Sequence, residues 1–262
     1  MKRNWKDLTG MRYTDEELAE AKAYLLQRRE SEQSMSADLL RLLELYASYL
    51  LTAMLNGNGV DDIELLIADL IERLMEDCEL LAVDEHDRRD SILLYMHGER
   101  NGDTLRGRVE KRVRTFVNEI TAVFVAGKLM DLGYNRMLQS IRANLQHPWE
   151  NDILVEARKL QEKGVIDSKY NFTTPHYGQG NPTSSLTALD NMLVYAVADA
   201  WNEWQWLDAK SNGAVGDYVE RGSSYPCDVC DGHTNTYYEI IDEENKPQYH
   251  LHCMCLVIYV YQ

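Results

Sequence analysis

Proline and cysteine are both scarce in this 262-residue chain, and neither is evenly spread. All five prolines come after residue 147, at positions 148, 175, 182, 226 and 247. Because proline breaks helices, its absence from the first half of the chain permits long helices there. No apolar run approaches the roughly 18 residues of a membrane span, so we expect no membrane partner. No apolar segment follows the N-terminal MKRNWKDLTG, so we expect no secretory signal and place synthesis in a reducing cytoplasm.

Basic residues are also scarce: the chain has 27 Lys and Arg against 43 Asp and Glu, which gives a net charge of −16. Such a surface repels phosphate backbones, so DNA contact is expected only indirectly or locally. The one dense basic run contains Arg106, Arg108, Lys111, Arg112 and Arg114. It is interpreted first as a solvated helix face, and second as a contact with nucleic acid or an acidic partner through Arg108, Lys111 and Arg112.

The first half of the chain is rich in helical periodicity. Thr14–Glu17 has the form of a capping box that opens one helix. Apolar residues at helical spacing predict further helices over about 36–55, 61–81 and 104–132. The first of these ends before an Asn-Gly-Asn-Gly turn at 56–59, and the third before Gly133. We predict a mainly α fold with a long helical N-terminal region and a small α+β C-terminal domain.

A segment rich in Gly, Pro, Ser, Thr and Asn, DSKYNFTTPHYGQGNPTSS, marks the main boundary. It predicts a helical domain over 1–167, a linker over 168–186 and a C-terminal domain over 187–262. The last domain opens with a helix that Thr187 can cap and that reaches about Ser211. Trp201 and Trp204 lie on this helix, and such a pair either packs a core or contacts a partner. The terminal CLVIYVY is β-branched and aromatic and predicts a strand.

Four of the five cysteines are concentrated near the C-terminus, in YPCDVC and HLHCMC. Cys227 and Cys230 have the spacing of a two-ligand hook, because a tight turn brings both thiolates onto one ion. In the second stretch, His250 and Cys253 are three apart and Cys253 and Cys255 two apart, so each pair can face one ion. Five candidates therefore compete for four ligand positions. The isolated Cys78 is interpreted as a small buried hydrophobe.

Thiolates with an imidazole in a tetrahedral set favour zinc over calcium or magnesium. A disulfide is disfavoured in a reducing compartment, and two cysteine pairs arriving together argue against uncommitted thiols. Four protein ligands leave no open position, and the sequence has no H-E-x-x-H motif. We therefore expect a structural zinc site that clamps a small domain, rather than a catalytic one.

The stretch from about Trp201 to Val260 resembles a known family. GDYVERG, Cys227-x-x-Cys230, an acidic loop with Pro247, His250-x-x-Cys253-x-Cys255 and a terminal strand are similar to the C-terminal half of phage head-morphogenesis proteins. These are the Mu F-like minor head proteins of tailed phages and prophages. Met254 stands where the family commonly has a basic residue between the two last cysteines. The metal-ligand pattern carries over to Cys227, Cys230, His250, Cys253 and Cys255.

The resemblance implies a low-copy minor capsid protein without enzymatic activity. Its expected partners are the portal protein and the major capsid or scaffold protein. Its expected location is the host cytoplasm during assembly and then the capsid interior of the virion, where it acts in head assembly or DNA delivery.

Two other functions compete with this one. The first is a zinc-stabilised HNH-like nuclease or toxin, with His233 as the candidate base. The second is a nucleic-acid-binding module that uses Arg106 to Arg114. A nuclease assay on a His233→Ala variant and a salt-dependent DNA-binding measurement separate both from the structural role.

Overall fold

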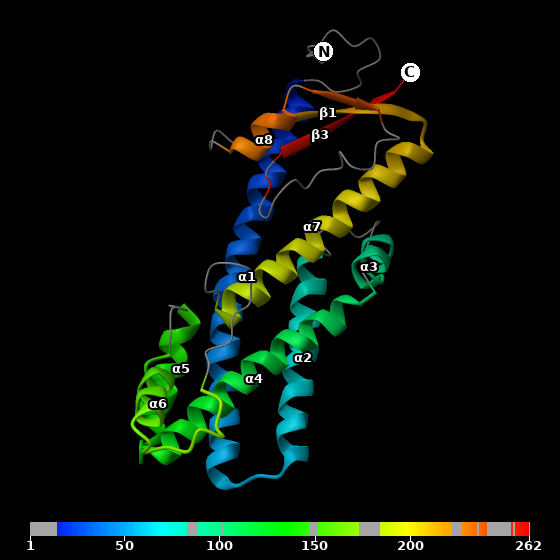
Figure 1. Ribbon diagram of the computed structural model, residues 1–262. Coiled ribbons are helices and arrows are strands. Elements are labelled where there is room, and N and C mark those ends of the chain that lie inside the picture. The colour runs from blue at the N-terminus through cyan, green and yellow to red at the C-terminus, as the bar shows by residue number, and fades with distance from the viewer. Residues whose placement is uncertain are drawn as a thin grey trace. The chain divides into compact units, whose positions relative to one another are not determined.

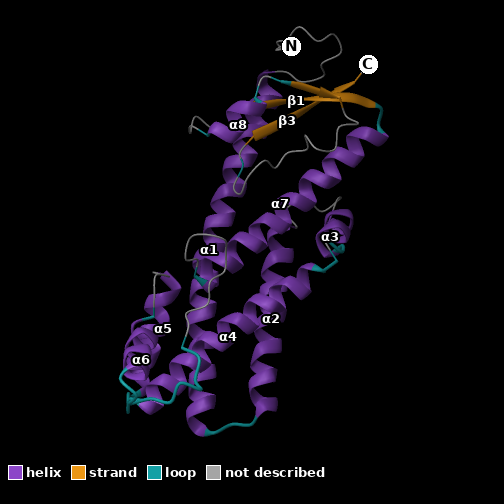
Figure 2. Ribbon diagram, in the orientation of Figure 1, coloured by secondary structure: helices purple, strands orange, loops and turns teal. Residues whose placement is uncertain are grey.

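The computed structural model describes residues 15–82, 89–100, 102–146, 151–172, 184–221, 227–234, 236–239, 253 and 255–261. Within these ranges the chain is mostly helical, and its strands are confined to one small C-terminal sheet (Figures 1 and 2). This confirms the predicted mainly α fold class. The elements are α1 Asp15–Asn56, α2 Val60–Ala82, α3 Arg89–His97, α4 Leu105–Leu129, α5 Tyr134–Gln146, α6 Asp152–Glu162, α7 Ser185–Ser211, β1 Ala214–Arg221, α8 Asp228–His233, β2 Tyr237–Glu239 and β3 Cys255–Tyr261. Among the described helices, none is both long enough and apolar enough to cross a membrane.

The chain gathers into two compact units, each drawn from separate stretches of sequence. Unit 1 takes Met1–Ser34, Cys78–Gly98 and Leu193–Gln262, and unit 2 takes Met35–Asp77 and Glu99–Met192. Helices α1, α2 and α7 thus contribute residues to both units. The predicted domains 1–167 and 187–262 stay a prediction, and most of the predicted linker 168–186 lies outside the described residues.

Helix α1 runs without interruption over 42 residues, where the sequence had predicted two helices. The prediction was wrong because the connecting stretch contains neither proline nor glycine, and its serines tolerate helix geometry. Ser31 Oγ donates a hydrogen bond to the Gln27 carbonyl oxygen at 3.3 Å. Glu32 is buried and pairs with Arg28 and Arg29 one turn earlier, which supports the helix across this stretch.

The ends of the helices follow turn chemistry, with one difference from the prediction. Gly57 has a φ of 72°, so the predicted turn after α1 is confirmed. Helix α4 ends at Leu129, and Asp131, with a φ of 55°, adopts the left-handed conformation expected of Gly133. An aspartate can occupy this region at modest energetic cost, which sequence alone did not reveal.

Unit 2 is a helical assembly in which α4 packs against α5 and α6. The α4 residues that face this core are apolar and share one stripe, as predicted: Val109, Val113, Phe116, Ile120 and Val123. Glu119, on the same helix, is the exception, because it is buried with only 4% of its surface exposed. Its carboxylate accepts hydrogen bonds from Asn144 Nδ2 and, at 3.1 Å, from Ser185 Oγ. Burial raises the pKa of Glu119 above its ordinary value, and these two hydrogen bonds only partly oppose that shift.

Replacing Glu119 by glutamine is expected to flatten the pH dependence of unit 2 stability. A folded-state pKa above the unfolded value means that folding takes up a proton. The stabilisation is fully present below the unfolded pKa and is lost as the pH rises through the folded pKa. Glu119→Gln removes this loss, so the variant should gain stability relative to the unsubstituted chain as the pH rises. Urea unfolding at pH 4 and pH 8 checks this, with the exposed Glu162→Gln as control. An equal pH slope in Glu119→Gln and the unsubstituted chain would contradict it.

Unit 1 contains a three-stranded antiparallel sheet in the order β2-β1-β3. Residues that oppose each other on paired strands share a face, so the register defines two faces. On one face Tyr218 and Ile258 pack with Leu18 of α1. On the other face Tyr259 packs with Trp206 of α7. The short α8 lies beside this sheet (Figure 1) and carries the first cysteine hook.

Candidate metal centre

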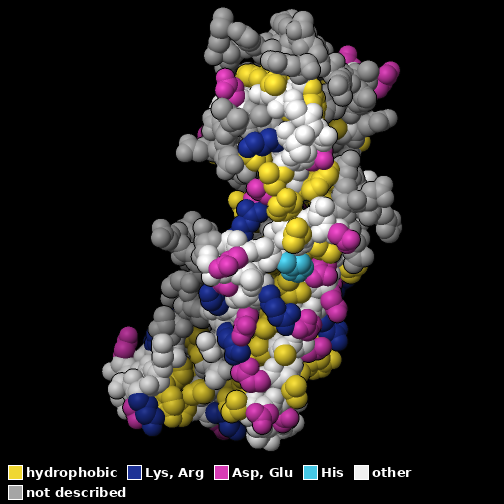
Figure 3. Space-filling model, turned by 90° about the vertical axis from the view of Figure 1, so that its right-hand side faces the viewer, with side chains coloured by type: hydrophobic (Ala, Val, Ile, Leu, Met, Phe, Trp, Pro, Cys, Tyr) yellow, Lys and Arg dark blue, Asp and Glu magenta, His cyan; other side chains and the backbone are white. Residues whose placement is uncertain are grey.

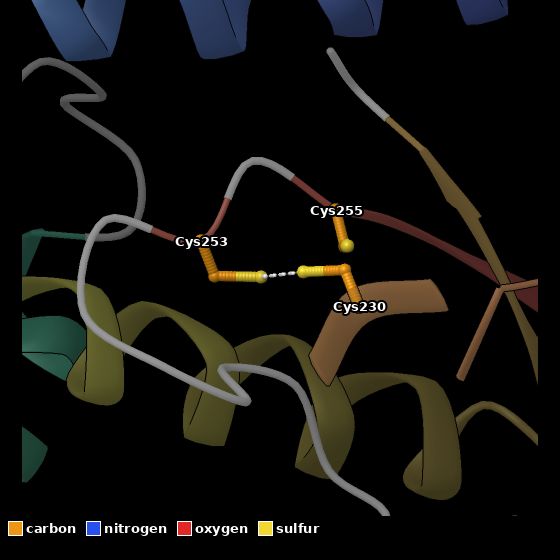
Figure 4. A group of neighbouring side chains, drawn as sticks. All are labelled: Cys230, Cys253 and Cys255. Atoms are coloured by element: carbon orange, nitrogen blue, oxygen red, sulfur yellow. Dashed lines mark hydrogen bonds between the residues drawn. The ribbon is translucent and has the colours of Figure 1, made fainter. Parts of the chain in front are cut away.

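Three cysteine sulfurs converge in unit 1 from elements far apart in the sequence. Cys230 comes from α8, Cys253 precedes β3 and Cys255 is the first residue of β3. Their Sγ atoms all lie within 4.8 Å of one another, and the Cys230 and Cys253 sulfurs are 3.8 Å apart. Figure 4 shows the three side chains directed toward a common point. No described cysteine forms a disulfide, since all five are free thiols.

The first hook is shaped by the start of α8. Cys227 is the N-cap residue, with extended backbone angles, and its Sγ accepts a hydrogen bond from the Cys230 amide at 3.5 Å. The cap thus holds the Cys227 sulfur against the first turn of α8, on which Cys230 lies. The second hook consists of Cys253 and Cys255. It is positioned by the start of β3, because the antiparallel register sets Cys255 opposite Arg221 of β1.

The spacing of the sulfurs fits a tetrahedral metal ion. At a zinc–sulfur bond of about 2.3 Å, tetrahedral geometry separates neighbouring sulfurs by about 3.8 Å. The Cys230–Cys253 separation equals this value. The same distance is far longer than the roughly 2 Å of a disulfide bond. The donor set is therefore suited to a soft or borderline metal ion held by thiolates.

Two of the three clustered thiols, Cys230 and Cys255, have raised pKa values in the absence of a metal ion. Burial is the main cause that raises the pKa of Cys230 to about 12; the Cys255 thiol opposes this shift, and the Cys253 and Cys227 thiols add to it. The pKa of Cys255 is raised further, first by its hydrogen bond with Cys253 and then by burial. A bound cation would oppose these shifts, since its charge stabilises thiolates directly.

Two arginines reach the hooks from neighbouring elements. Arg28 of α1 donates a long hydrogen bond, 3.5 Å, to the carbonyl oxygen of Cys253, and pairs with the buried Glu32. Arg221 of β1 pairs with Asp231 Oδ1 at 3.1 Å. Sequence reasoning missed both arginines, and the only signal for Arg221 was its place in the VERG segment just before the first hook.

The structure brings together three of the five predicted ligands and places a fourth, Cys227, next to Cys230. Cys230, Cys253 and Cys255 form the cluster, and Cys227 adjoins it through Cys230. His250, like His252, lies outside the described residues. His233, the base of the nuclease hypothesis, has its Nδ1 3.0 Å from the Tyr238 hydroxyl on β2.

Cys78 has a purely structural environment. Its side chain is fully buried, 3.7 Å from both the Met96 sulfur and the Leu193 carbonyl oxygen. The prediction that it acts as a small buried hydrophobe is confirmed.

The tryptophans of the predicted partner site are largely enclosed. Trp201 is 5% exposed and Trp204 is half-buried, with ring centroids 5.7 Å apart in an edge-to-face arrangement. Trp206, on the same helix, is 1% exposed. The partner-binding role of Trp201 and Trp204 stays a prediction.

The basic run of α4 is paired with acidic side chains. Lys111 lies 2.6 Å from Asp103, and Arg114 makes two 3.1 Å hydrogen bonds with Glu64. Figure 3 shows Lys and Arg interspersed with Asp and Glu on the face in view. These contacts are typical of a solvated, salt-bridged helix face. The three candidates in this run are Arg108, Lys111 and Arg112, and their role in partner binding stays a prediction.

Comparisons with known proteins identify no relative. No protein-family model matches the chain, and no curated protein or solved structure matches it either.

Proposed function

We propose that this chain is a minor capsid protein of a tailed phage or prophage, acting in head morphogenesis with a structural zinc centre in its C-terminal region. It would associate with the portal and the procapsid interior during head assembly or DNA delivery. The observation that carries the proposal is the convergence of Cys230, Cys253 and Cys255. The same cysteines carry the resemblance to Mu F-like head proteins, so the sequence motif and the geometry concern one set of residues.

Burial supports a structural centre over a catalytic one. Cys230 and Cys253 are only 4% and 5% exposed. A catalytic zinc keeps one position open to water or substrate, whereas a fourth protein ligand here would close the coordination sphere. The bound ion would supply cross-linking between α8 and β3, which the small sheet of unit 1 needs for stability.

The fourth ligand is expected to be Cys227. Its sulfur already contacts Cys230, whose amide donates to it, as in a preformed hook. The Cys227→Ser variant should therefore lose zinc and change the visible spectrum of the cobalt-substituted protein. The His250→Ala variant should retain zinc and show the same cobalt spectrum as the unsubstituted chain. Zinc per chain, by mass spectrometry under native conditions, and the cobalt spectrum provide the measurement. Zinc retained by Cys227→Ser and lost by His250→Ala would assign the position to the imidazole instead.

The assembly role is tested by co-expression with the portal, scaffold and major capsid proteins of the phage or prophage that would encode this chain. We expect the chain to copurify with procapsids, and the Cys253→Ser variant to be depleted from them because its C-terminal region is unclamped. Cys78→Ala is the control, since that thiol lies outside the cluster and alanine keeps its buried site apolar. Procapsids that never contain the chain would refute the role.

The nuclease alternative has its own outcome in a separate assay. Purified chain with added divalent metal should leave DNA and RNA intact. Metal-dependent cleavage that His233→Ala abolishes would replace the capsid proposal with the nuclease.

A further inference from the structure

Arg221 stands where the two cysteine hooks meet. It is the last residue of β1, and in the antiparallel register its backbone opposes Cys255, the first residue of β3. Its guanidinium also pairs with Asp231, the residue that follows Cys230 on α8, at 3.1 Å. One residue is therefore linked through its backbone to the second hook and through its side chain to the first.

From this double link we infer that Arg221 is a positioning residue that holds the two cysteine hooks in register with each other before an ion binds. The inference rests on the proposed metal centre and adds to it the element that aligns its two halves. Arg221 is not a ligand, because arginine does not lose its charge in proteins.

The strand register determines the face of the sheet on which the Arg221 side chain meets Asp231. Opposed residues of an antiparallel pair project to the same face with Cβ atoms about 4.5–5.5 Å apart. The Arg221 side chain therefore leaves the sheet on the face of Cys255, where Asp231 of α8 meets it. The Arg221 side chain is 22% exposed and that of Asp231 58%, so the arginine side chain is largely enclosed while the aspartate side chain is partly solvated. The rigid fork of arginine fixes α8 more narrowly than a lysine ammonium would.

Among the residues that the structure describes, the other charged groups near the cluster do not duplicate this link. Arg28 reaches the backbone of Cys253 and so acts on the second hook, with its charge held against Glu32. Lys22 pairs with Glu220 at 2.8 Å, and Glu220 faces the opposite side of β1 from Arg221. The Lys22–Glu220 pair therefore provides a matched control on the same strand.

Metal affinity is the first test. Zinc dissociation constants, measured on this chain by chelator competition, should rise about threefold to fivefold in Arg221→Met and in Asp231→Asn. The double variant should lose no more than either single variant, because both remove the same link. Arg221→Lys should recover part of the loss, and Lys22→Met should stay within about twofold of the unsubstituted chain. The cobalt spectrum of Arg221→Met should be unchanged, since its ligands are unchanged.

A second measurement needs no metal. In the metal-free chain, a mild diazene oxidant such as diamide takes two electrons and two protons from the Cys230 and Cys253 thiols and joins their sulfurs. The rate at which this disulfide forms, followed by mass spectrometry, should fall about fivefold in Arg221→Met and stay unchanged in Lys22→Met. Only the Arg221→Met substitution removes the contact between α8 and the strand that bears the second hook.

The two measurements separate the possible failures. The inference is wrong if Arg221→Met has the same zinc affinity and the same rate of disulfide formation as the unsubstituted chain. It is also wrong if the losses of zinc affinity in the two single variants add fully in the double variant. An unsubstituted chain that binds no zinc, with the disulfide rate still dependent on Arg221, would overturn the zinc centre while supporting the positioning role.

Discussion

If the proposed metal centre is occupied, removing its ion is expected to unfold the C-terminal sheet of unit 1 while the helices of unit 2 remain folded. The sheet has three strands, and its two faces bury small clusters around Tyr218 and Trp206. A core of this size supplies little stability alone. Where free zinc stands at 1,000 times its dissociation constant, linkage contributes about 4 kcal/mol to the folded state. Chelation removes that whole contribution from unit 1.

The measurement uses two optical signals with different origins. Trp201, Trp204 and Trp206, three of the five tryptophans, lie on the α7 segment of unit 1, so their fluorescence reports on that unit. Far-ultraviolet circular dichroism reports on the helices, most of which should persist. A chelator should shift the fluorescence and leave most of the dichroism, and zinc should restore the fluorescence.

Two variants control this experiment. Cys253→Ser should show the shifted fluorescence before any chelator is added, whereas Cys78→Ala should respond as the unsubstituted chain does. If the fluorescence stays constant after mass spectrometry shows the metal gone, the ion does not clamp unit 1.

Helical periodicity predicted most of the fold, because packing of an apolar stripe is a local property of the sequence. The helices over 61–81 and 104–132 were placed within a few residues, and the terminal strand over CLVIYVY was placed at its observed bounds. The continuity of α1 was missed, since it depends on how Glu32 is buried and paired. The gathering of Leu18 with the C-terminal sheet was also beyond prediction, because contacts between distant segments leave no periodic signal.

The candidate metal centre was likewise predictable only in its local features. Ligand spacing is local, so the two hooks could be recognised from Cys-x-x-Cys and Cys-x-Cys. The sequence could not place Cys230 3.8 Å from Cys253, because that distance depends on how α8 meets the start of β3. Arg221 was missed for the same reason, since its significance arises only from the register of β1 with β3.

Truncating Trp206 to alanine is expected to be the most damaging single change in the core of unit 1. The side chain is 1% exposed and packs with Ala209, Ala214 and Tyr259, which joins α7 to both long strands. The Lys210 ammonium lies 4.4 Å from the ring centroid and adds a cation–π contact. Loss of a fully buried tryptophan leaves a cavity and costs about 3–5 kcal/mol.

Trp204→Ala is the matched control on the same helix. Trp204 is half-buried, so its loss should cost only about 1 kcal/mol. Urea unfolding of both variants at saturating zinc, followed by the fluorescence of the remaining tryptophans, provides the comparison. A larger loss in Trp204→Ala than in Trp206→Ala would place the main packing of α7 elsewhere. With the expected order, Trp204 can be replaced in assembly assays without unfolding unit 1, so any loss of procapsid association in that variant would report on partner contact rather than on stability.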